Sequence, residues 1–324
     1  MLNSLKDSIA LVTGGGGFIG SYIVDGLLES GAQEVRVVDN FLRGRPENLA
    51  AALISEKVKF TRGDIRDRDL LKSLVEGCQV VFHQAALRIT HCAVEPRTAI
   101  EVMIDATFDL VEQCHQCGVG KLVCASSASI YGQADAFPTT EAAPPYANRT
   151  LYGAAKLFGE GLLRSYNDMF GLPYVCLRYF NVYGPRMDVH GKYTEVLVRW
   201  MERIERGLPP IVFGSGDQTM DFIYVADVAR ANLLAAASPV TDDAFNIGTG
   251  VETSLKQLAR VLLKVMGRED LEVEHAEERQ INPVGRRLAD VARAHERLGF
   301  RSSVDLETGL RRLVEWWRAN GKTS

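Results

Sequence analysis

Short apolar segments alternate with longer amphipathic segments through the first half of the chain. The segments with strand-like patterns are Ile9–Thr13, Glu34–Asp39, Lys57–Arg62, Gln79–His83, Lys121–Ser126 and Pro173–Tyr179. The segments with helical periodicity are Phe18–Glu29, Asp67–Glu76, Thr98–Cys117 and Leu151–Phe170. Strands separated by helices are typical of βαβ units, so the pattern predicts an α/β fold with a Rossmann-type, doubly wound parallel sheet.

This rhythm breaks after Asn181, where turn-forming clusters of Gly and Pro separate shorter elements. The last element is an amphipathic helix over about residues 306–318. We therefore expect a smaller mixed α/β lobe at the C-terminal end that binds the substrate. The expected division is 1–180 plus about 221–248 for the cofactor domain, and 181–220 plus 249–324 for the substrate lobe. No Ser/Pro linker separates them, so a cleft between two packed lobes is expected.

Composition limits the function classes. The chain has 324 residues, 46% of them hydrophobic, and a formal net charge of −4, which is enough apolar content for a full core. We expect no nucleic-acid partner because there is no Lys/Arg run, and no membrane span because no apolar run reaches ~18–20 residues. The first residues lack the regions of a signal peptide, so a cytoplasmic location is the default expectation.

Six cysteines are present, and Cys114 and Cys117 form a CxxC pair. Zinc needs a second pair of ligands at workable spacing, and the sequence offers none. A redox role needs a helix N-terminus, whereas this pair lies near a predicted helix end. We therefore interpret the cysteines as buried thiols of a reducing compartment and predict no metal site.

A glycine-rich segment, TGGGGFIG, directly follows the first predicted strand and opens the first helix. In this context Gly14 would make the tight turn, Gly17 would let the backbone approach a pyrophosphate, and Gly20 would let the helix pack on the strand. The helix N-terminus, with Phe18 and Ile19, would then face the phosphates. The alternative is an ordinary glycine-rich turn.

The second predicted strand ends at Asp39, followed by Asn40, about 20 residues beyond the glycines, where a carboxylate can bind the ribose hydroxyls of a dinucleotide. A carboxylate repels a 2′-phosphate, so the cofactor is predicted to be NAD. Arg43 lies close enough in sequence to keep NADP as the lesser alternative.

Polar and small residues end the next two strands. Asp64, followed by Ile65, would accept from an adenine amino group, although an Asp here is also a common helix cap. His83 precedes Gln84-Ala85-Ala86, whose small side chains would let the cofactor lie across the sheet edge. We interpret His83 as a buried, hydrogen-bonded histidine and not as a catalyst.

Tyr152 and Lys156 are four residues apart on a predicted helix, so they share one face. A neighbouring ammonium group favours the phenolate and lowers a tyrosine pKa from its ordinary value of about 10. Tyr152 would then exchange a proton with an alcohol while a nicotinamide exchanges the hydride. Lys156 would also bind the nicotinamide ribose. The spacing alone is common in helices and gains weight from its place after the fifth strand.

The fifth strand ends in Ala125-Ser126-Ser127-Ala128-Ser129, at the edge where open α/β sheets bind ligands. A hydroxyl there would hold the substrate alcohol and share developing charge. A plain Ser-rich turn is the alternative. Ser126, Ser127 and Ser129 are the candidates for this hydroxyl.

Taken together, the motifs resemble the extended short-chain dehydrogenase/reductase family, specifically its NAD-dependent nucleotide-sugar epimerases and dehydratases. The segments that carry the resemblance, in order, are TGGGGFIG, DN, GDIRD, HQAA, SSASIYG, YGAAK, RYFNVYGPR and DFIYVADVA. The likeness covers essentially the whole chain and is more specific for the superfamily than for the substrate. It implies catalysis by Ser127, which lies four residues before Tyr131, together with Tyr152 and Lys156.

The resemblance also implies ligand contacts. It assigns further cofactor contacts to Arg88, Ala125 and Tyr179, and nucleotide-sugar contacts to Asn181, Glu195 and Val196. Many relatives grip the diphosphate with an Arg where this chain has Met220. Arg279, Arg286 and Arg287 are candidates to replace it, with Arg279 the best match and a solvated turn the alternative for Arg286.

Relatives diverge after forming a 4-keto sugar, and those of the 4,6-dehydratase type carry an Asp-Glu pair beside the catalytic hydroxyl. Here the positions hold Ala128 and Ser129, so C4 epimerisation of a UDP-sugar with NAD regenerated is the predicted reaction. The alternatives are another epimerase, a dehydratase, a net dehydrogenase or a non-catalytic NAD sensor.

Two arginines bear on the sugar. Arg287 falls where 4-epimerases gate the C2 or C5 substituent, and it or Arg186 would meet a C6 carboxylate. UDP-glucuronate therefore competes with UDP-glucose as substrate. The resemblance further implies a homodimer through the two long helices, with Val102, Ile104, Phe108 and Val111 as an apolar face; packing of these residues on the sheet is the alternative.

Overall fold

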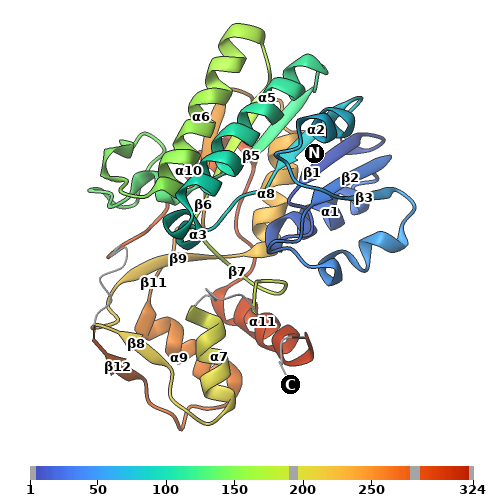
Figure 1. Cartoon of the computed structure of the whole chain (residues 1–324). Helices are drawn as coiled ribbons and strands as arrows, with labels where there is room; N and C mark the ends of the chain where they lie inside the picture. Colours follow the sequence, from blue (N-terminus) through green and yellow to red (C-terminus); the bar gives the residue numbers. More distant parts are fainter. Residues whose placement is uncertain (1–4, 190–195, 278–284, 321–324) are drawn as a thin grey trace.

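In a computed structural model, residues 5–189, 196–277 and 285–320 are described, and two layers of helices enclose a seven-stranded sheet (Figure 1). The strand order is β10-β6-β5-β4-β1-β2-β3, and every pairing is parallel. The strands are β1 Ile9–Thr13, β2 Glu34–Asp39, β3 Val58–Arg62, β4 Val80–His83, β5 Lys121–Ser127, β6 Tyr174–Tyr179 and β10 Asp243–Ile247. The sequence predicted the first six of these within one residue at each end.

The two faces of the sheet carry separate apolar cores, as a doubly wound fold requires. One core packs the sheet against α1 (Phe18–Glu29), α8 (Val225–Ala237) and α10 (Ala292–Leu298). The other packs it against α2 (Arg68–Val75), α5 (Ala106–Gln116) and α6 (Leu151–Phe170). Because both faces are covered, the central strands read as continuous apolar runs, and the predicted fold class is confirmed.

The helix predicted over 98–117 is interrupted in the structure. It consists of α4 (Pro96–Ile100), a π-helical turn at Glu101–Asp105, and α5, and it follows the short α3 (Ile89–Val94). The wide turn buries Met103 against Leu87 and Ala155, below the start of α6. A single π turn inside an α-helix is a frequent feature of functional sites, and periodicity alone does not reveal it.

A smaller lobe follows β6. Its strands form a sheet of β7 (Asn181–Tyr183), β9 (Thr219–Tyr224) and β11 (Glu252–Ser254), and a pair of β8 (Ile211–Phe213) and β12 (Glu274–Ala276). Its helices are α7 (Val196–Glu205), α9 (Leu255–Met266) and α11 (Leu306–Asn320). Trp200, Leu258, Leu310 and Trp317 share its core.

The division into lobes stays a proposal, with adjustments from the packing. Residues 225–247 return to the cofactor lobe as α8 and β10, as the division has it, whereas β9 belongs to the small sheet. Ala294, Leu298 and Phe300 pack in the cofactor lobe's core, so residues 292–300 belong there and not to the substrate lobe. The chain returns to the cofactor lobe here because α10 packs on β10, although β11, α9 and β12 lie between these two elements in the sequence.

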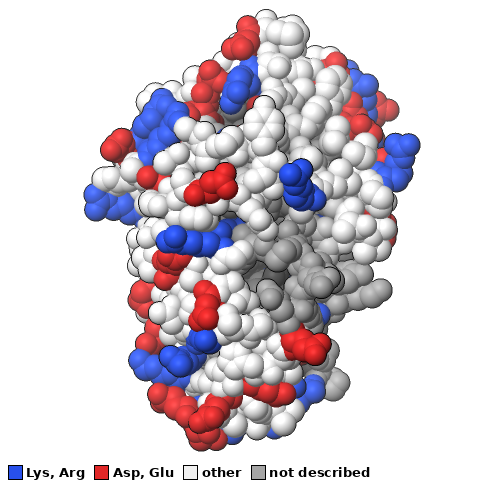
Figure 2. Space-filling model, turned by 90° about the vertical axis from the view of Figure 1, so that its left-hand side faces the viewer, with Lys and Arg blue, Asp and Glu red and all other residues white. Residues whose placement is uncertain are grey.

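Acidic and basic side chains are interspersed over the face shown in Figure 2. Among the described residues no helix is long and apolar enough to cross a membrane. All six cysteines are free, five of them buried, and no group of potential metal-binding side chains occurs in the described ranges.

Candidate active site

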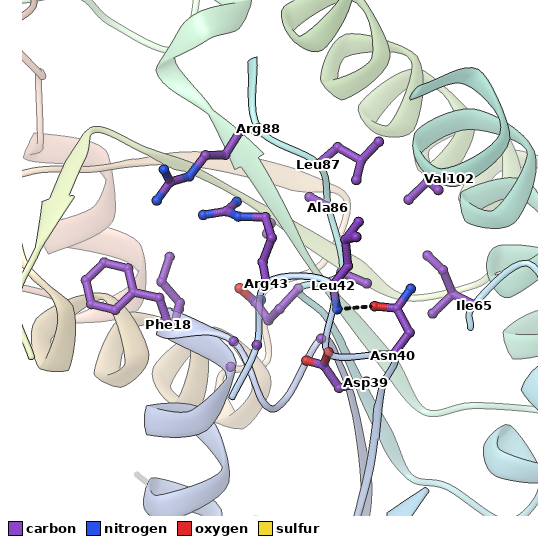
Figure 3. A pocket seen from close by; sticks show the side chains of 18 of the residues that line it. Phe18, Asp39, Asn40, Leu42, Arg43, Ile65, Ala86, Leu87, Arg88 and Val102 are labelled. Carbon is purple, nitrogen blue, oxygen red and sulfur yellow. Dashed lines mark hydrogen bonds between the residues drawn. The ribbon is translucent and has the colours of Figure 1, made fainter. Parts of the chain in front are cut away.

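A cleft of about 470 Å³ lies over the carboxyl ends of β1, β2, β4 and β5 (Figure 3). Every residue that the sequence assigned to the cofactor lines it: Gly14, Gly17, Phe18, Ile19, Gly20, Asp39, Asn40, Arg43, Asp64, Ile65, Gln84, Ala85, Ala86, Arg88, Ala125, Tyr152, Lys156 and Tyr179. These residues come from segments far apart in the chain, and parallel strands bring their ends to one edge.

The glycine loop is sterically closed to larger residues. Gly14 has φ +66°, and a β-carbon there would lie 2.7 Å from the backbone nitrogen of Ala85. A β-carbon on Gly20 would lie 2.3 Å from the carbonyl oxygen of Gly14. The turn and the close helix packing predicted for these two glycines are therefore what the structure shows, and the free N–H groups at the start of α1 face the cleft.

Asp39 is held at the end of β2 by backbone donors. Its Oδ2 accepts from the N–H of Gly16 at 3.0 Å and its Oδ1 from the N–H of Phe41 at 2.8 Å. Burial raises the pKa of Asp39, and these hydrogen bonds oppose that rise. Carboxylate oxygens have further lone pairs, so the fixed side chain can still accept from ribose hydroxyls in the cleft.

Asp64 is paired rather than capping a helix. Arg66 binds it at 2.9 Å and Asn40 donates from its Nδ2 at 3.0 Å, and chiefly the Arg66 hydrogen bond lowers the pKa of Asp64 to about 2. Asp67 caps α2 instead, accepting from the N–H of Leu70. Asp64 thus presents a charged carboxylate to the cleft.

Two arginines enter the cleft from different loops. Arg43 follows β2 and Arg88 follows β4, and in Figure 3 both guanidinium groups extend across the cleft toward the side of Phe18. Arg43 also approaches Asp188 at 3.8 Å, so the loop after β2 is tied to the loop after β7. Positive charge near the start of α1 suits a diphosphate.

His83 is a structural residue, as predicted. Its Nδ1 lies 2.8 Å from Thr13 Oγ1 and its Nε2 lies 3.1 Å from Thr107 Oγ1. Burial, followed by the charge of Lys156, lowers the pKa of His83 to about 3. The imidazole is therefore neutral at pH 7 and joins β1, β4 and α5.

The three predicted catalytic residues meet at one end of the cleft. Helix α6 begins just before Tyr152, where Thr150 Oγ1 accepts from the N–H of Gly153 at 3.0 Å. One turn later the Lys156 ammonium donates to the carbonyl of Ala125 at 2.6 Å and lies 5.9 Å from the centre of the Tyr152 ring. Ser127 ends β5 beside Tyr179 of β6.

The hydrogen bonds distinguish the neighbouring serines. Ser126 donates to the buried carboxylate of Glu160 at 2.5 Å, which occupies its hydroxyl. Ser127 Oγ accepts from the N–H of Ser129 at 3.1 Å, which leaves its own proton free to donate. Ser127 therefore suits a substrate alcohol better than Ser126 does, which favours the prediction made from sequence.

Most of the described residues that were predicted to bind the substrate do not line the cleft, unlike those predicted to bind the cofactor. Arg186 lines the cleft, but it pairs with Asp25 of α1 at 2.7 Å and stacks on Tyr22, so its charge is already matched. Asn181 in β7 and Val196 at the start of α7 do not line the cleft. Glu195 and Arg279 lie outside the described residues.

The adjacent arginines 286 and 287 have opposite environments. Arg286 is exposed and paired with Glu252 at 2.6 Å, in agreement with a solvated turn. Arg287 is half-buried; burial lowers its pKa, and the nearby Tyr152 opposes this. Its Nε has no hydrogen-bond partner among the described residues. Arg287 does not line the cleft described above.

These features fit a dinucleotide: a glycine loop at a helix N-terminus, a fixed carboxylate at the end of β2, and a Tyr/Lys/Ser group at the far end. The family model described as the NAD dependent epimerase/dehydratase family matches residues 10–248. The chain belongs to this family. The matched segment contains the glycine loop, Asp39, Ser127, Tyr152 and Lys156.

Similar proteins span nearly the whole chain. A putative UDP-glucose 4-epimerase of Methanocaldococcus jannaschii is 36% identical over 97% of this chain and 99% of its own length. The structure of the UDP-glucose 4-epimerase of Thermotoga maritima, with UDP-glucose, is 36% identical, with a TM-score of 0.89 and coverage of 97% and 100%. The UDP-N-acetylglucosamine 4-epimerase of Methanobrevibacter ruminantium, in complex with UDP-N-acetylmuramic acid, is 33% identical, with a TM-score of 0.91 and coverage of 97% and 99%.

Sequence reasoning missed part of the lining. Leu42, Leu87, Thr98 and Val102 contribute side chains to the cleft, and Asp188 contributes a carboxylate. Leu42 and Leu87 adjoin recognised motifs and were within reach of the same argument. Thr98 lies just before the π-helical turn, Val102 lies within it and Asp188 lies in an irregular loop, so no periodic signal marked them as cleft residues.

Proposed function

We propose that this protein inverts the configuration at C4 of a UDP-sugar through a transient 4-keto intermediate, with NAD regenerated in each cycle. The observation that carries the proposal is the convergence of Ser127, Tyr152 and Lys156 at one end of a cleft whose other end has the groups for a nucleotide. The relatives named as UDP-sugar 4-epimerases over almost the full chain support it.

The site's residues would divide the work as follows. NAD, when bound, would supply a reversible acceptor for the C4 hydride. Tyr152 takes the proton of the C4 hydroxyl while Ser127 donates a hydrogen bond to that oxygen. Lys156 lies 5.9 Å from the centre of the Tyr152 ring and has N–H groups beyond the one bound to Ala125, which can bind the nicotinamide ribose. After the sugar turns its other face, Tyr152 returns the proton to the oxygen, so protons and hydrides balance.

The turn after Ser127 favours epimerisation over dehydration. Loss of a C6 hydroxyl needs a separate acid and base beside the keto sugar. Ala128 has no such group, and Ser129 presents its N–H to Ser127. Epimerisation needs no group beyond the three already assembled.

Arg287 favours a sugar that carries a carboxylate. A half-buried guanidinium whose Nε has no hydrogen-bond partner among the described residues, and which interacts with the nearby Tyr152, is stabilised by an anionic ligand. The exposed Arg286 beside it already has Glu252. We therefore propose UDP-glucuronate as the preferred substrate over UDP-glucose.

The decisive experiment is an NMR time course of the purified protein with UDP-glucose, UDP-glucuronate and UDP-N-acetylglucosamine in parallel. We expect a C4-inverted sugar without net NADH, formed fastest from UDP-glucuronate. A keto or unsaturated product, or accumulation of NADH, would contradict epimerisation. Preference for UDP-N-acetylglucosamine would contradict only the role of Arg287.

We further propose a homodimer through α5 and α6. Val111 is buried in the sheet's core, and Val102 and Ile104 are partly packed, so most of the predicted apolar face serves the fold. Phe108, Phe158, Met169 and Phe170 are exposed on the same two helices and support an interface there. The free thiols support a cytoplasmic location.

A further inference from the structure

A buried ion pair lies directly behind the catalytic residues. Arg178 of β6 donates from Nε and Nη2 to the two carboxylate oxygens of Glu160 at 2.9 and 2.6 Å. Both side chains are buried, at 7% and 4% exposed. The reaction proposed above makes no use of either group, and two charges removed from water are costly unless their geometry is fixed.

Each partner of this pair is attached to an element that also delivers a site residue. Glu160 lies on α6 one turn beyond Lys156, and Arg178 directly precedes Tyr179 in β6. Ser126, which donates to Glu160 at 2.5 Å, directly precedes Ser127 in β5. The pair therefore joins the three elements at the point where their side chains enter the cleft.

Helix α6 is consequently attached to β5 by two successive contacts. Lys156 donates to the carbonyl of Ala125, and one turn later Glu160 accepts from Ser126, the next residue of the strand. Tyr152 lies one turn before Lys156 on this helix, and Ser127 follows Ser126 at the strand's end; both line the cleft. Side chains four residues apart share a helix face, so a shift of α6 at Glu160 would displace Lys156 and Tyr152 together.

The surroundings hold the pair from the other side. Arg178 Nη1 donates to the hydroxyl of Tyr131 and to the carbonyl of Glu141, both at 2.8 Å, and Tyr131 donates to Asn246 of β10 at 2.7 Å. Lys156, Glu160 and Ser126 also line a small cavity of about 10 Å³, which has room for roughly one water molecule. Within the described ranges the ammonium of Lys156 is anchored by its hydrogen bond to the carbonyl of Ala125, so its place depends on how the helix sits on β5.

We propose that the Glu160–Arg178 ion pair, with Ser126, is a positioning device that fixes α6 so that Lys156 and Tyr152 meet the substrate at Ser127. This inference rests on the proposed function. It assigns Glu160 and Arg178 no contact with substrate or cofactor, and it assigns Ser126, which lines the cleft, a role through its hydrogen bond to Glu160. They act through Lys156 and Tyr152, so their effect belongs to the reaction step and not to binding.

The test compares Glu160→Gln with the parent protein and with a matched control. Asp243→Asn is that control, because Asp243 is a buried carboxylate of the same sheet and is paired with Arg293 and Arg297 of α10. It lies at the start of β10, at the sheet edge opposite the cleft. We expect both variants to lower the melting temperature. We expect Glu160→Gln alone to lower kcat about 10- to 100-fold, because small misplacements of catalytic groups have effects of this size. KM and the bound NAD content should stay within about 2-fold.

A double-mutant cycle separates positioning from plain stability. In a Lys156→Met background, Glu160→Gln should lower the single-turnover rate less than about 2-fold, because a residue that acts through Lys156 has little left to position. Ser126→Ala keeps the ion pair and removes only its attachment to β5. It should lower kcat about 3- to 10-fold with the same non-additivity, and it serves if Glu160→Gln does not fold.

Equal losses in the two backgrounds, or an unchanged kcat in both Glu160→Gln and Ser126→Ala, would overturn the positioning role. A loss of activity in Asp243→Asn that matches Glu160→Gln would also overturn it. A parent protein that inverts none of the three UDP-sugars contradicts the proposed function instead, so the two failures are distinguishable.

Discussion

The cofactor end and the substrate end of the cleft differ in how their residues are assembled. All 18 residues assigned to the cofactor from the sequence line one cleft, because each stands at the carboxyl end of a parallel strand or at the start of the helix that follows. The residues assigned to the sugar come from the end of β5, from β7 and the loop after it, from the start of α7 and from the segment after β12. Of the described ones only Ser127 and Arg186 line the cleft. A parallel sheet collects short motifs at one edge, whereas irregular connections do not.

The partners of the charged side chains also differ between the two ends of the cleft. At the cofactor end Asp39 and Asp64 are held by neighbours close in sequence or on the adjoining strand. In the substrate region Arg186 is matched by Asp25, which is distant in sequence, and the Arg287 Nε has no partner among the described residues. A charge with a distant partner, or with none, cannot be assigned from the local sequence.

The largest expected effect comes from Tyr152→Phe. This variant tests whether catalysis at one end of the cleft can be lost while NAD binding at the other end is kept. Removal of the phenol hydroxyl removes the acid–base group and should lower kcat about 10³-fold. The bound NAD content should be unchanged, because the ring remains in place. An NMR time course with an acid extract of the bound cofactor measures both, and full turnover in this variant would contradict the assigned role.

Gly14→Ala tests the cofactor end directly. The residue has φ +66° and no room for a β-carbon beside Ala85, and strain plus overpacking of about 1–3 kcal/mol each should weaken NAD binding at least ~10-fold. Gly77→Ala is the control, since Gly77 has φ +78° with nothing within 4 Å. Retention of NAD by Gly14→Ala, seen in the absorbance ratio of the purified protein, would refute the loop's role.

Arg287→Met sharpens the contrast at the substrate end. Loss of a charge-assisted contact of about 1.5–3 kcal/mol should raise KM for UDP-glucuronate roughly 10- to 100-fold and leave UDP-glucose almost unaffected. Arg286→Met, which removes the exposed neighbour paired with Glu252, should change neither value. Parallel losses for both substrates in Arg287→Met would show a structural role.

The last prediction concerns His83 and the stability of the cofactor lobe in acid, away from the pH at which the site works. Its folded pKa of about 3 lies below the ordinary value of 6.5, so the unfolded chain binds the proton more strongly. Its contribution is complete above pH 6.5 and is lost at about 1.4 kcal/mol per pH unit as the pH falls toward 3. His83→Gln should flatten this part of the profile in urea titrations; an unchanged slope would argue against a buried neutral imidazole.

The elements of the cofactor lobe were predictable because their information is local. Apolar periodicity located β1 and α1 to the residue, and the spacing from Gly14 to Asp39 indicated the nucleotide fold. The π-helical turn at Glu101–Asp105 was not predictable, since a single wide turn hardly disturbs a helical pattern. The return of α10 to the first core depends on β10, which no pattern within α10 encodes.

By itself the sequence determined the α/β fold, the NAD-type loop and the Ser127, Tyr152 and Lys156 group, because short motifs next to strands encode them. Only the tertiary structure decided that Ser126 is occupied by Glu160, that Arg186 is matched by Asp25, and that Arg287 is half-buried with its Nε unpartnered among the described residues. The reason is that burial and charge pairing depend on which distant segments the sheet brings together. The sequence around Ser126, Arg186 and Arg287 does not show which segments those are.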